Sequence, residues 1–279
     1  MMIFGTIGVF VDRIALPSDE IALYRALIAT VLLAGYLLVT RQGFRIGNPR
    51  ELPLLLLSGV AMGFNWILLF EAYRYTTVSV ATLSYYFAPV LMTVMSGVLF
   101  RERLTLRQGV CFVLSTGGLA LVVLGTPQSL NGNEHLIGIA FGLGAAALYA
   151  TVVLLNKGIK GVEGIGRTFW QFVAAAAVLL PYVWCTGGFT VHTLQADGWV
   201  SLLILGVVHT GITYCLYFGA VKALSGQQIA IFSYIDPLFA VALSATVLSE
   251  PLSVWQMIGG AMILIFTLLS EWKRKTSRK

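Results

Sequence analysis

The sequence has very little charge for its length. Of its 279 residues only 11% are charged and 58% are hydrophobic, whereas an average soluble domain is about 25% charged. The mean hydropathy is +0.86. So few charged side chains cannot cover the surface of a water-exposed globule of this length, which excludes an ordinary soluble fold.

Motifs of phosphate-driven and hydrolytic chemistry are also absent. The sequence has no GxxxxGK phosphate-binding loop, which excludes an ATP-driven pump, and it has neither HExxH nor GxSxG. Cys111, Cys185 and Cys215 lie in or at the ends of apolar segments without paired spacing, which favours packing over metal binding. We therefore expect no enzyme activity, no catalytic residue, no metal and no cofactor.

The sequence is instead rich in long apolar runs, such as residues 75–100 and 168–196, which contain no Asp, Glu, Lys or Arg. A helix of about 20 apolar residues crosses the bilayer core, and lipid offers no partner to the backbone of a non-helical segment. The runs predict an all-α integral membrane protein. Its ten transmembrane helices are expected at residues 1–16, 20–40, 52–74, 77–99, 105–124, 136–157, 167–186, 197–221, 225–248 and 253–271.

The basic residues predict the orientation of these helices. With the N-terminus inside, all of the 18 Lys and Arg residues fall on the cytoplasmic side except Arg13, Arg25 and Arg74. This asymmetry follows the positive-inside rule and predicts a multi-pass protein of the cytoplasmic membrane with both termini in the cytoplasm. Because the charge is spread over loops at the lipid surface, including the tail from Lys273, no nucleic-acid partner is expected.

The chain contains an internal repeat. A shift of 148 positions without a gap aligns Pro89 with Pro237 and Glu102 with Glu250, and apolar composition alone does not produce such matches. Each repeat holds five helices, an odd number, so the second copy enters the membrane from the opposite side. Inverted repeats around a central cavity are typical of alternating-access transporters. We assign the first repeat to residues 1–124, an external linker to 125–135, and the second repeat with a basic cytoplasmic tail to 136–279.

Similar helix starts occur in both repeats. Residues 105–108 and 253–256 each fit a capping box, with a hydroxyl at the cap and Gln three residues later. Glu102 and Glu250 lie three residues before these caps. We expect each glutamate to support the positive N-terminus of the next helix, and a transport role is the alternative.

At these residues the sequence resembles the EamA family of the drug/metabolite transporter superfamily. The first half has Ala-Pro followed by Phe-Arg-Glu-Arg-Leu-Thr, and the second has Asp-Pro followed by Leu-Ser-Glu-Pro-Leu-Ser. Arg25 matches an arginine common in that family, whereas Phe4-Gly5 departs from its usual Trp-Gly. The resemblance implies a ten-helix bundle with a central cavity that exports or exchanges small metabolites, without implying which metabolite.

Asp236 is the leading candidate for substrate binding or ion coupling. It is the one charged residue of the predicted helix 225–248, and Pro237 removes a backbone donor beside it, which opens the helix locally. An acid at this depth would bind a cationic group or carry a proton, and a neutral structural acid is the alternative. Gln228, Phe232 and Asp236 share one stripe of this helix.

His209 is a second candidate, in the predicted helix 197–221. It would hydrogen-bond the substrate or shuttle protons, or else tie two helices together. Tyrosines supply aromatic walls with hydroxyl tips, with packing or an interfacial position as the alternative. The further cavity candidates, several of them related by the repeat, are Asn65, Trp66, Tyr86, Thr213, Tyr214, Tyr217 and Tyr234.

Arg25 lies about five residues into the predicted helix 20–40. Its side chain is expected to snorkel to the outer surface, to pair with Asp19 or Glu71, or to bind a carboxylate bidentately. Among these, a structural role is the favoured interpretation.

These features predict a secondary active transporter, an exporter or exchanger of small polar metabolites. The acid, histidine, amides and tyrosines suit amino-acid-like or amine-bearing solutes better than a polyphosphate, which would need several inward Arg or Lys. We expect alternating access and proton coupling. The alternative is an intramembrane enzyme or signalling subunit that uses Asp236 and His209. The expected partners are the metabolite, protons and the lipid bilayer, and the chain is expected to act as a monomer or homodimer.

Overall fold

The computed structural model describes residues 2–41, 44, 48–99, 105–125, 132–162, 164–221 and 232–271. These ranges are mostly helical, and no strand occurs among them. The first half contains α1 (Met2–Gly5), α2 (Ile7–Asp12), α3 (Ser18–Val39), η1 (Pro49–Glu51), α4 (Leu52–Tyr75), α5 (Val78–Tyr85), α6 (Ala88–Leu99) and α7 (Leu106–Leu124). The second contains α8 (Gly132–Lys157), α9 (Gly164–Thr186), η2 (Val191–Thr193), α10 (Ala196–Ile204), η3 (Leu205–Ile212), α11 (Thr213–Val221), α13 (Ile235–Thr246) and α14 (Val254–Glu271).

Seven helical segments among the described residues are long and apolar enough to cross a membrane. Each overlaps one of the predicted ranges from 20–40 to 197–221, so an all-helical membrane protein is confirmed there. Three further apolar helices are shorter, at Met2–Asp12, Ile235–Thr246 and Val254–Ser270. The count of ten transmembrane helices therefore stays a prediction.

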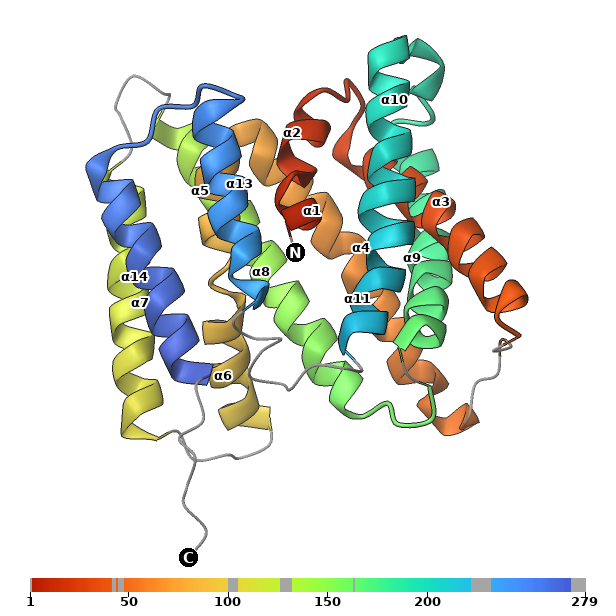
Figure 1. Cartoon of the computed structure of the whole chain (residues 1–279), viewed down its shortest axis with the longest axis horizontal. Coiled ribbons are helices and arrows are strands. Elements are labelled where there is room, and N and C mark those ends of the chain that lie inside the picture. Colours follow the sequence, from red (N-terminus) through yellow and green to blue (C-terminus); the bar gives the residue numbers. More distant parts are fainter. Residues whose placement is uncertain are drawn as a thin grey trace, which may run out of the picture.

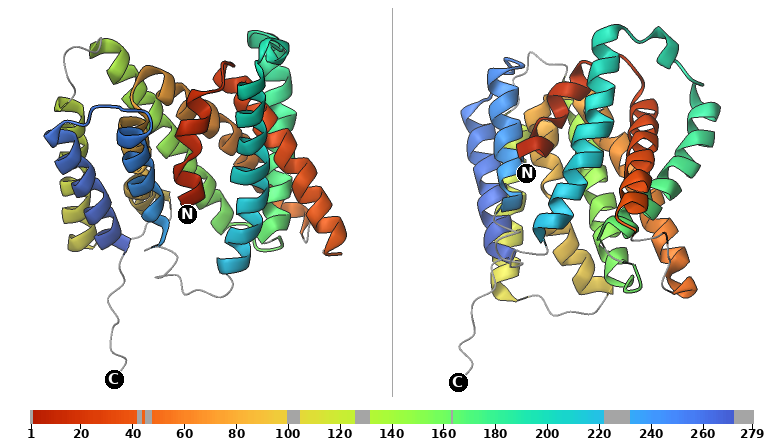
Figure 2. Two further views of the ribbon diagram at one scale, coloured as in Figure 1. Left: turned by 45° about the horizontal axis from the view of Figure 1, so that its top comes forward. Right: turned by 45° about the vertical axis from the view of Figure 1, so that its right-hand side comes forward.

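The helices form a bundle in which α7 and α14 pack together at one edge and α3 and α9 pack together near the other (Figure 1). Helix α4 packs on both α8 and α9, and α5 packs on α13. The two views of Figure 2 show α1 and α2 in the interior, where α1 contacts α13 and α2 contacts α10. The first helical segments of the chain therefore lie against helices of the second half.

The largest buried cluster lies where α3, α4, α9 and η3 meet. Phe70 of α4, Phe172 of α9 and Leu205 of η3 are completely buried there. Lipid tails are as apolar as leucine, so close van der Waals contact holds such helices together in a bilayer more than exclusion of water does. This cluster fixes the helices that carry the polar residues of the interior.

Both predicted capping boxes are present. The Thr105 backbone N–H donates to Gln108 Oε1 at 2.9 Å and the Gln108 N–H donates to Thr105 Oγ1 at 3.3 Å. The pair Ser253 and Gln256 makes the same two bonds at 3.0 and 3.2 Å. These reciprocal bonds satisfy two donors at the start of α7 and of α14, which explains why both helices begin there.

The glycines of α4 and α8 allow close helix packing. A Cβ atom at Gly59 would lie 2.4 Å from the Gln171 carbonyl oxygen of α9, and one at Gly142 would lie 2.9 Å from the Ser84 Cβ of α5. Only a residue without Cβ permits such contact between backbones.

We expect Gly59→Ala to destabilise the protein by about 1–3 kcal/mol, because the added methyl group forces α4 and α9 apart. Gly35→Ala is the matched control, since nothing lies within 4 Å of a Cβ atom in that part of α3. There the substitution should be neutral or stabilising by up to about 1 kcal/mol. Denaturation of detergent-purified variants measures both effects, and equal stability of the two would show that α4 and α9 do not pack so closely.

Candidate functional site

Two helices of the bundle are interrupted at positions related by the repeat. In the first half α5 ends at Tyr85, and Tyr86 and Phe87 form a turn before α6 begins. In the second half Tyr234 forms a turn immediately before α13. Proline follows each interruption by a few residues, and a proline in a helix lacks the N–H that would bond the carbonyl four residues earlier. Both interruptions therefore have the same local cause.

The two interruptions contact each other through Asp236 and Tyr86. Asp236 lies in the first turn of α13, and its Oδ2 accepts a hydrogen bond from the Tyr86 hydroxyl. Gly5 of α1 packs on the same place, since a Cβ atom there would lie 2.7 Å from the Asp236 carbonyl oxygen. The turn at Tyr234 separates Phe232 from Asp236, so the predicted continuous stripe is wrong at that point. Gln228 lies outside the described residues.

Arg25 is buried in the interior, with 3% of its surface exposed. Its Nε donates to Thr210 Oγ1 at 2.8 Å, and its Cζ lies 4.5 Å from the centre of the Trp66 ring and 5.8 Å from that of Phe70. The expectation that it snorkels to the outer surface is therefore wrong, because the side chain extends into the interior of the bundle, toward aromatic rings on α4.

The predicted ion pairs of Arg25 are also absent. Glu71 pairs with Arg74 at 3.3 Å, and Asp19 accepts a hydrogen bond from Thr186 at 2.8 Å. Within the described residues no carboxylate lies within 4.0 Å of the Arg25 guanidinium. The third alternative, binding of a carboxylate from outside the protein, is the one that the contacts leave open.

A π-helical segment, η3, positions Thr210 and His209. In its wider turns the Thr210 hydroxyl donates to the Leu205 carbonyl at 2.9 Å, and the Thr213 hydroxyl donates to the Val208 carbonyl at 2.6 Å. Each of these carbonyls lies five residues earlier in the chain. A π-helix turns less per residue than an α-helix. Residues four positions apart therefore do not line up across this segment as they would in an α-helix, and no sequence signal marked it.

His209 ties helices together. Its Nε2 lies 2.5 Å from the Thr6 hydroxyl between α1 and α2, and its Nδ1 lies 3.2 Å from the Ile204 carbonyl. Phe10 contacts the ring edge-on at 5.1 Å. Both ring nitrogens thus have protein partners, which favours the structural alternative for this residue.

The aromatic candidates gather around Phe172 of α9. Its ring lies 5.2 Å from Trp66 and 5.4 Å from Tyr214, between the two repeat-related side chains. Tyr85 contacts Tyr86 at 6.0 Å. Trp66 and Phe172 therefore lie near Arg25, and Tyr85 and Tyr86 lie near Asp236, and an aromatic wall around a substrate stays a prediction.

The remaining sequence candidates lie elsewhere in the bundle, and a role in substrate binding stays a prediction for each of them. Asn65 donates from Nδ2 to the Ala145 carbonyl of α8 at 2.6 Å, and the Tyr85 hydroxyl lies beside its amide. Tyr234 is buried in a cluster with Val80 and Leu83. Tyr217 is partly exposed on α11.

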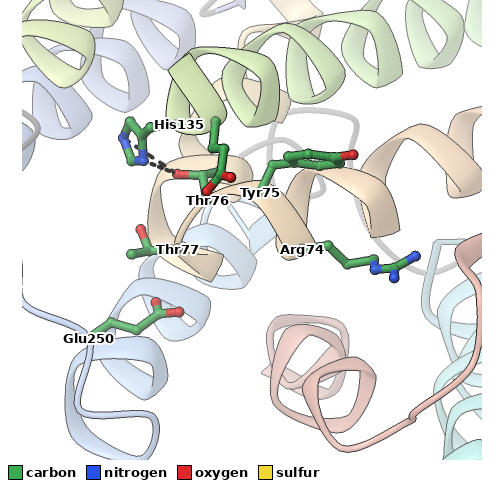
Figure 3. Close-up of a pocket in the computed structure, with 7 residues that line it drawn as sticks. Arg74, Tyr75, Thr76, Thr77, His135 and Glu250 are labelled. Atoms are coloured by element: carbon green, nitrogen blue, oxygen red, sulfur yellow. Dashed lines mark hydrogen bonds between the residues drawn. The ribbon is translucent and has the colours of Figure 1, made fainter. Parts of the chain in front are cut away.

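A separate pocket of about 270 Å³ opens at the end of the bundle where α4 meets α5 (Figure 3). His135 is hydrogen-bonded to the Thr76 hydroxyl at 2.7 Å. Sequence reasoning missed this pair because α4 and α8 meet only in the fold. The pocket residues are Arg74, Tyr75, Thr76, Thr77, Glu134, His135 and Glu250.

Glu250, which borders this pocket, caps a helix of the other half. Its Oε1 accepts the Val78 N–H of α5 at 3.0 Å, and its Oε2 accepts the hydroxyl of Ser244, which in turn accepts the Ser79 hydroxyl at 2.7 Å. The expectation that Glu250 supports the next helix, α14, is wrong, although it does stabilise a helix N-terminus. Glu102 lies outside the described residues. Among the described residues no three His, Cys, Asp or Glu side chains are grouped to hold a metal.

Comparison with known proteins places the chain among transporters. The family model described as EamA-like transporter family matches residues 1–124 and 136–272. The uncharacterized transporter YxxF of Bacillus subtilis is 31% identical over 99% of this chain and 88% of its own length, and an uncharacterized transporter of Archaeoglobus fulgidus is 30% identical over 98% and 93%. A crystal structure 18% identical in sequence shares the fold, with a TM-score of 0.67 over 96% of this chain and 92% of that chain. The chain therefore belongs to the EamA-like transporter family and is a multi-pass membrane transporter.

Proposed function

We propose that the chain is a secondary active transporter of small polar metabolites that works by alternating access between two inverted repeats. The observation that carries this proposal is the contact between the two interrupted helices, where Tyr86 of one half donates to Asp236 of the other. Broken helices that meet at a repeat interface are typical substrate and ion sites of secondary transporters. Backbone carbonyls left without a proline N–H partner, together with one acid, would then be available to solute and ion.

The packing of equivalent helices supports the inverted repeat. Under the 148-residue shift α3 corresponds to α9 and α7 to α14, and each of these two pairs packs directly together. Elements related by a two-fold axis meet their own copies where they lie at that axis. An axis in the membrane plane would let the halves exchange positions and expose the interior alternately to each side.

Asp236 is the proposed coupling residue, and amino-acid-like or amine-bearing solutes are the proposed substrates. The carboxyl group of Asp236 accepts a hydrogen bond from Tyr86, and within the described residues it has no cationic partner within 4.0 Å. An acid in this setting binds either a proton or a cationic group of the solute. Competition between the two would couple solute export or exchange to proton movement.

Flux measurement in liposomes tests the transport proposal. Purified protein should accumulate a labelled amino acid, amine, nucleoside or sugar by counterflow when the same unlabelled solute is loaded inside, and empty liposomes are the control. Chemical turnover of a solute without movement across the bilayer would contradict transport and favour the intramembrane enzyme or signalling subunit that uses Asp236 and His209.

Cysteine labelling tests the proposed topology of the protein in the cytoplasmic membrane. The exposed Cys185 at the end of α9 should react with an impermeant maleimide from outside the cell. In a Cys185→Ser background, Asn131→Cys should be labelled from outside and Thr276→Cys only after the membrane is opened. Positions 131 and 276 lie outside the described residues. Labelling of both from the same face would contradict the ten-helix topology.

A further inference from the structure

We propose that Arg25 binds a carboxylate of the transported solute, so that the substrate is a carboxylic acid or zwitterion; this inference rests on the proposed function. It narrows the substrate class, since amines, nucleosides and neutral sugars lack the required group. The argument depends on the burial of Arg25 and on the partners that it has and lacks.

A buried guanidinium without a counter-ion is costly in a membrane protein. Arg25 is 3% exposed, and its Nε bond to Thr210 is its one hydrogen bond within the described residues. The guanidinium has five N–H donors, so most of its hydrogen-bonding capacity is unused. Structural arginines at membrane depth are normally paired with an acid or with backbone carbonyls. Here an anion from outside the protein would complete the pairing.

Three acids that could pair with Arg25 in this bundle each have another partner. Glu20 on α3 accepts hydrogen bonds from the backbone N–H and the hydroxyl of Thr190. Glu71 on α4 pairs with Arg74, and Asp236 accepts from Tyr86. Arg25 therefore keeps its charge available for a ligand.

The surroundings of Arg25 are suited to hold one carboxylate. The Trp66 ring lies 4.5 Å from Cζ, and Thr210 holds Nε, so the side chain is fixed at two points. Tyr73, Tyr85 and Tyr214 are neighbours of the guanidinium. The two Nη nitrogens could then bind a carboxylate in the bidentate manner typical of arginine.

The charge available favours a monoanion. Arg25 is the one buried Lys or Arg among the described residues, whereas a phosphate ester would need more than one cation. Tyr73 and Tyr85 are neighbours of both Arg25 and Asp236. A zwitterion could thus place its carboxylate at Arg25 and its ammonium toward Asp236.

A binding experiment on detergent-purified protein tests the proposal without a gradient or flux. Leucine, phenylalanine and glutamine are each compared with the matching primary amide, which has the same size but no carboxylate. We expect one or more of the acids, and none of the amides, to raise the thermal stability of wild-type protein. Arg25→Met should abolish this stabilisation, and Arg25→Lys should weaken binding by about tenfold or more, because lysine lacks the planar fork. Arg13→Gln, at an exposed arginine, should bind as wild type.

The ligand-free variant separates a binding role from a structural one. Removing an unpaired buried charge should leave Arg25→Met as stable as wild type or more stable, whereas loss of a structural arginine should lower its unfolding temperature. If Arg25→Met does not fold, its structural role is shown and the proposal fails. The proposal also fails if the amides stabilise as well as the acids, if Arg25→Met retains the stabilisation, or if none of the acids stabilises wild type.

These outcomes are distinct from failure of the proposed function. Binding of acids through Arg25 without any flux in liposomes would contradict transport but would still support the carboxylate site at Arg25. Flux of solutes without a carboxylate at equal rates in wild type and Arg25→Met would support transport and overturn the site.

Discussion

Asp236→Asn is expected to abolish transport driven by a pH gradient. Asparagine keeps an oxygen that can accept the Tyr86 hydroxyl, so the contact between the two interrupted helices should persist and the protein should fold and insert. The amide cannot take up or release a proton, so proton movement can no longer alternate with solute binding. Exchange of solute for solute, which needs no net proton transfer, should continue.

Initial flux into liposomes, measured with and without an imposed pH gradient, checks this expectation. Asp197→Asn is the matched control, because Asp197 is exposed at the start of α10 and accepts only the N–H of its neighbour Gly198. Tyr86→Phe separates the hydrogen bond from the ionisable group and should retain a response to the gradient. If Asp236→Asn responds to the gradient at the wild-type rate, the acid is structural and the coupling mechanism is wrong.

Glu250→Ala is expected to destabilise the protein by about 2–4 kcal/mol, because it removes the two acceptors of a network that joins the halves. The Val78 N–H and the Ser244 hydroxyl would both lose their bonds to this carboxylate, and the start of α5 would lose its capping charge. Glu250→Gln should retain much of the stability, since an amide oxygen can still accept from Val78.

Thermal and detergent-induced unfolding of the purified variants measures these differences. Glu134→Ala is the matched control, because Glu134 is an exposed acid that borders the same pocket. Stability of Glu250→Ala equal to that of Glu134→Ala would show that the network contributes nothing and that α5 and α13 are held by apolar packing alone.

Sequence patterns predicted the features that depend on composition and local spacing. The apolar runs located the helices because a bilayer allows few alternatives for such segments. The capping boxes were predicted because all their atoms lie within one turn of Thr105 or Ser253. Pro89 could also have located the interruption at Tyr86, as Pro237 did for the second half, because a proline disfavours helix in the residues just before it.

The features that prediction missed depend on contacts between distant segments. Glu250 accepts a hydrogen bond from Val78, which lies 172 positions away in the sequence, and His135 is hydrogen-bonded to Thr76, which lies 59 positions away. The burial of Arg25 could not be read from its place near a predicted helix end, because Trp66 and Thr210 come from two other helices. The π-helical segment η3 has no local signal, since no glycine or proline pattern distinguishes it from an α-helix.

The π-helical segment also has an evolutionary consequence. It packs more residues into each turn than an α-helix does, so deletion of one residue between Leu205 and Ile212 would restore a regular helix at little local cost. Because the π-turns absorb the extra residue, the helix beyond the deletion would keep nearly its orientation, whereas each residue of an α-helix turns the chain by about 100°. The second half of this chain can therefore lose one residue in η3 and keep Tyr214 near Phe172, whereas a deletion in the regular helix α4 would rotate Trp66 away from Phe172.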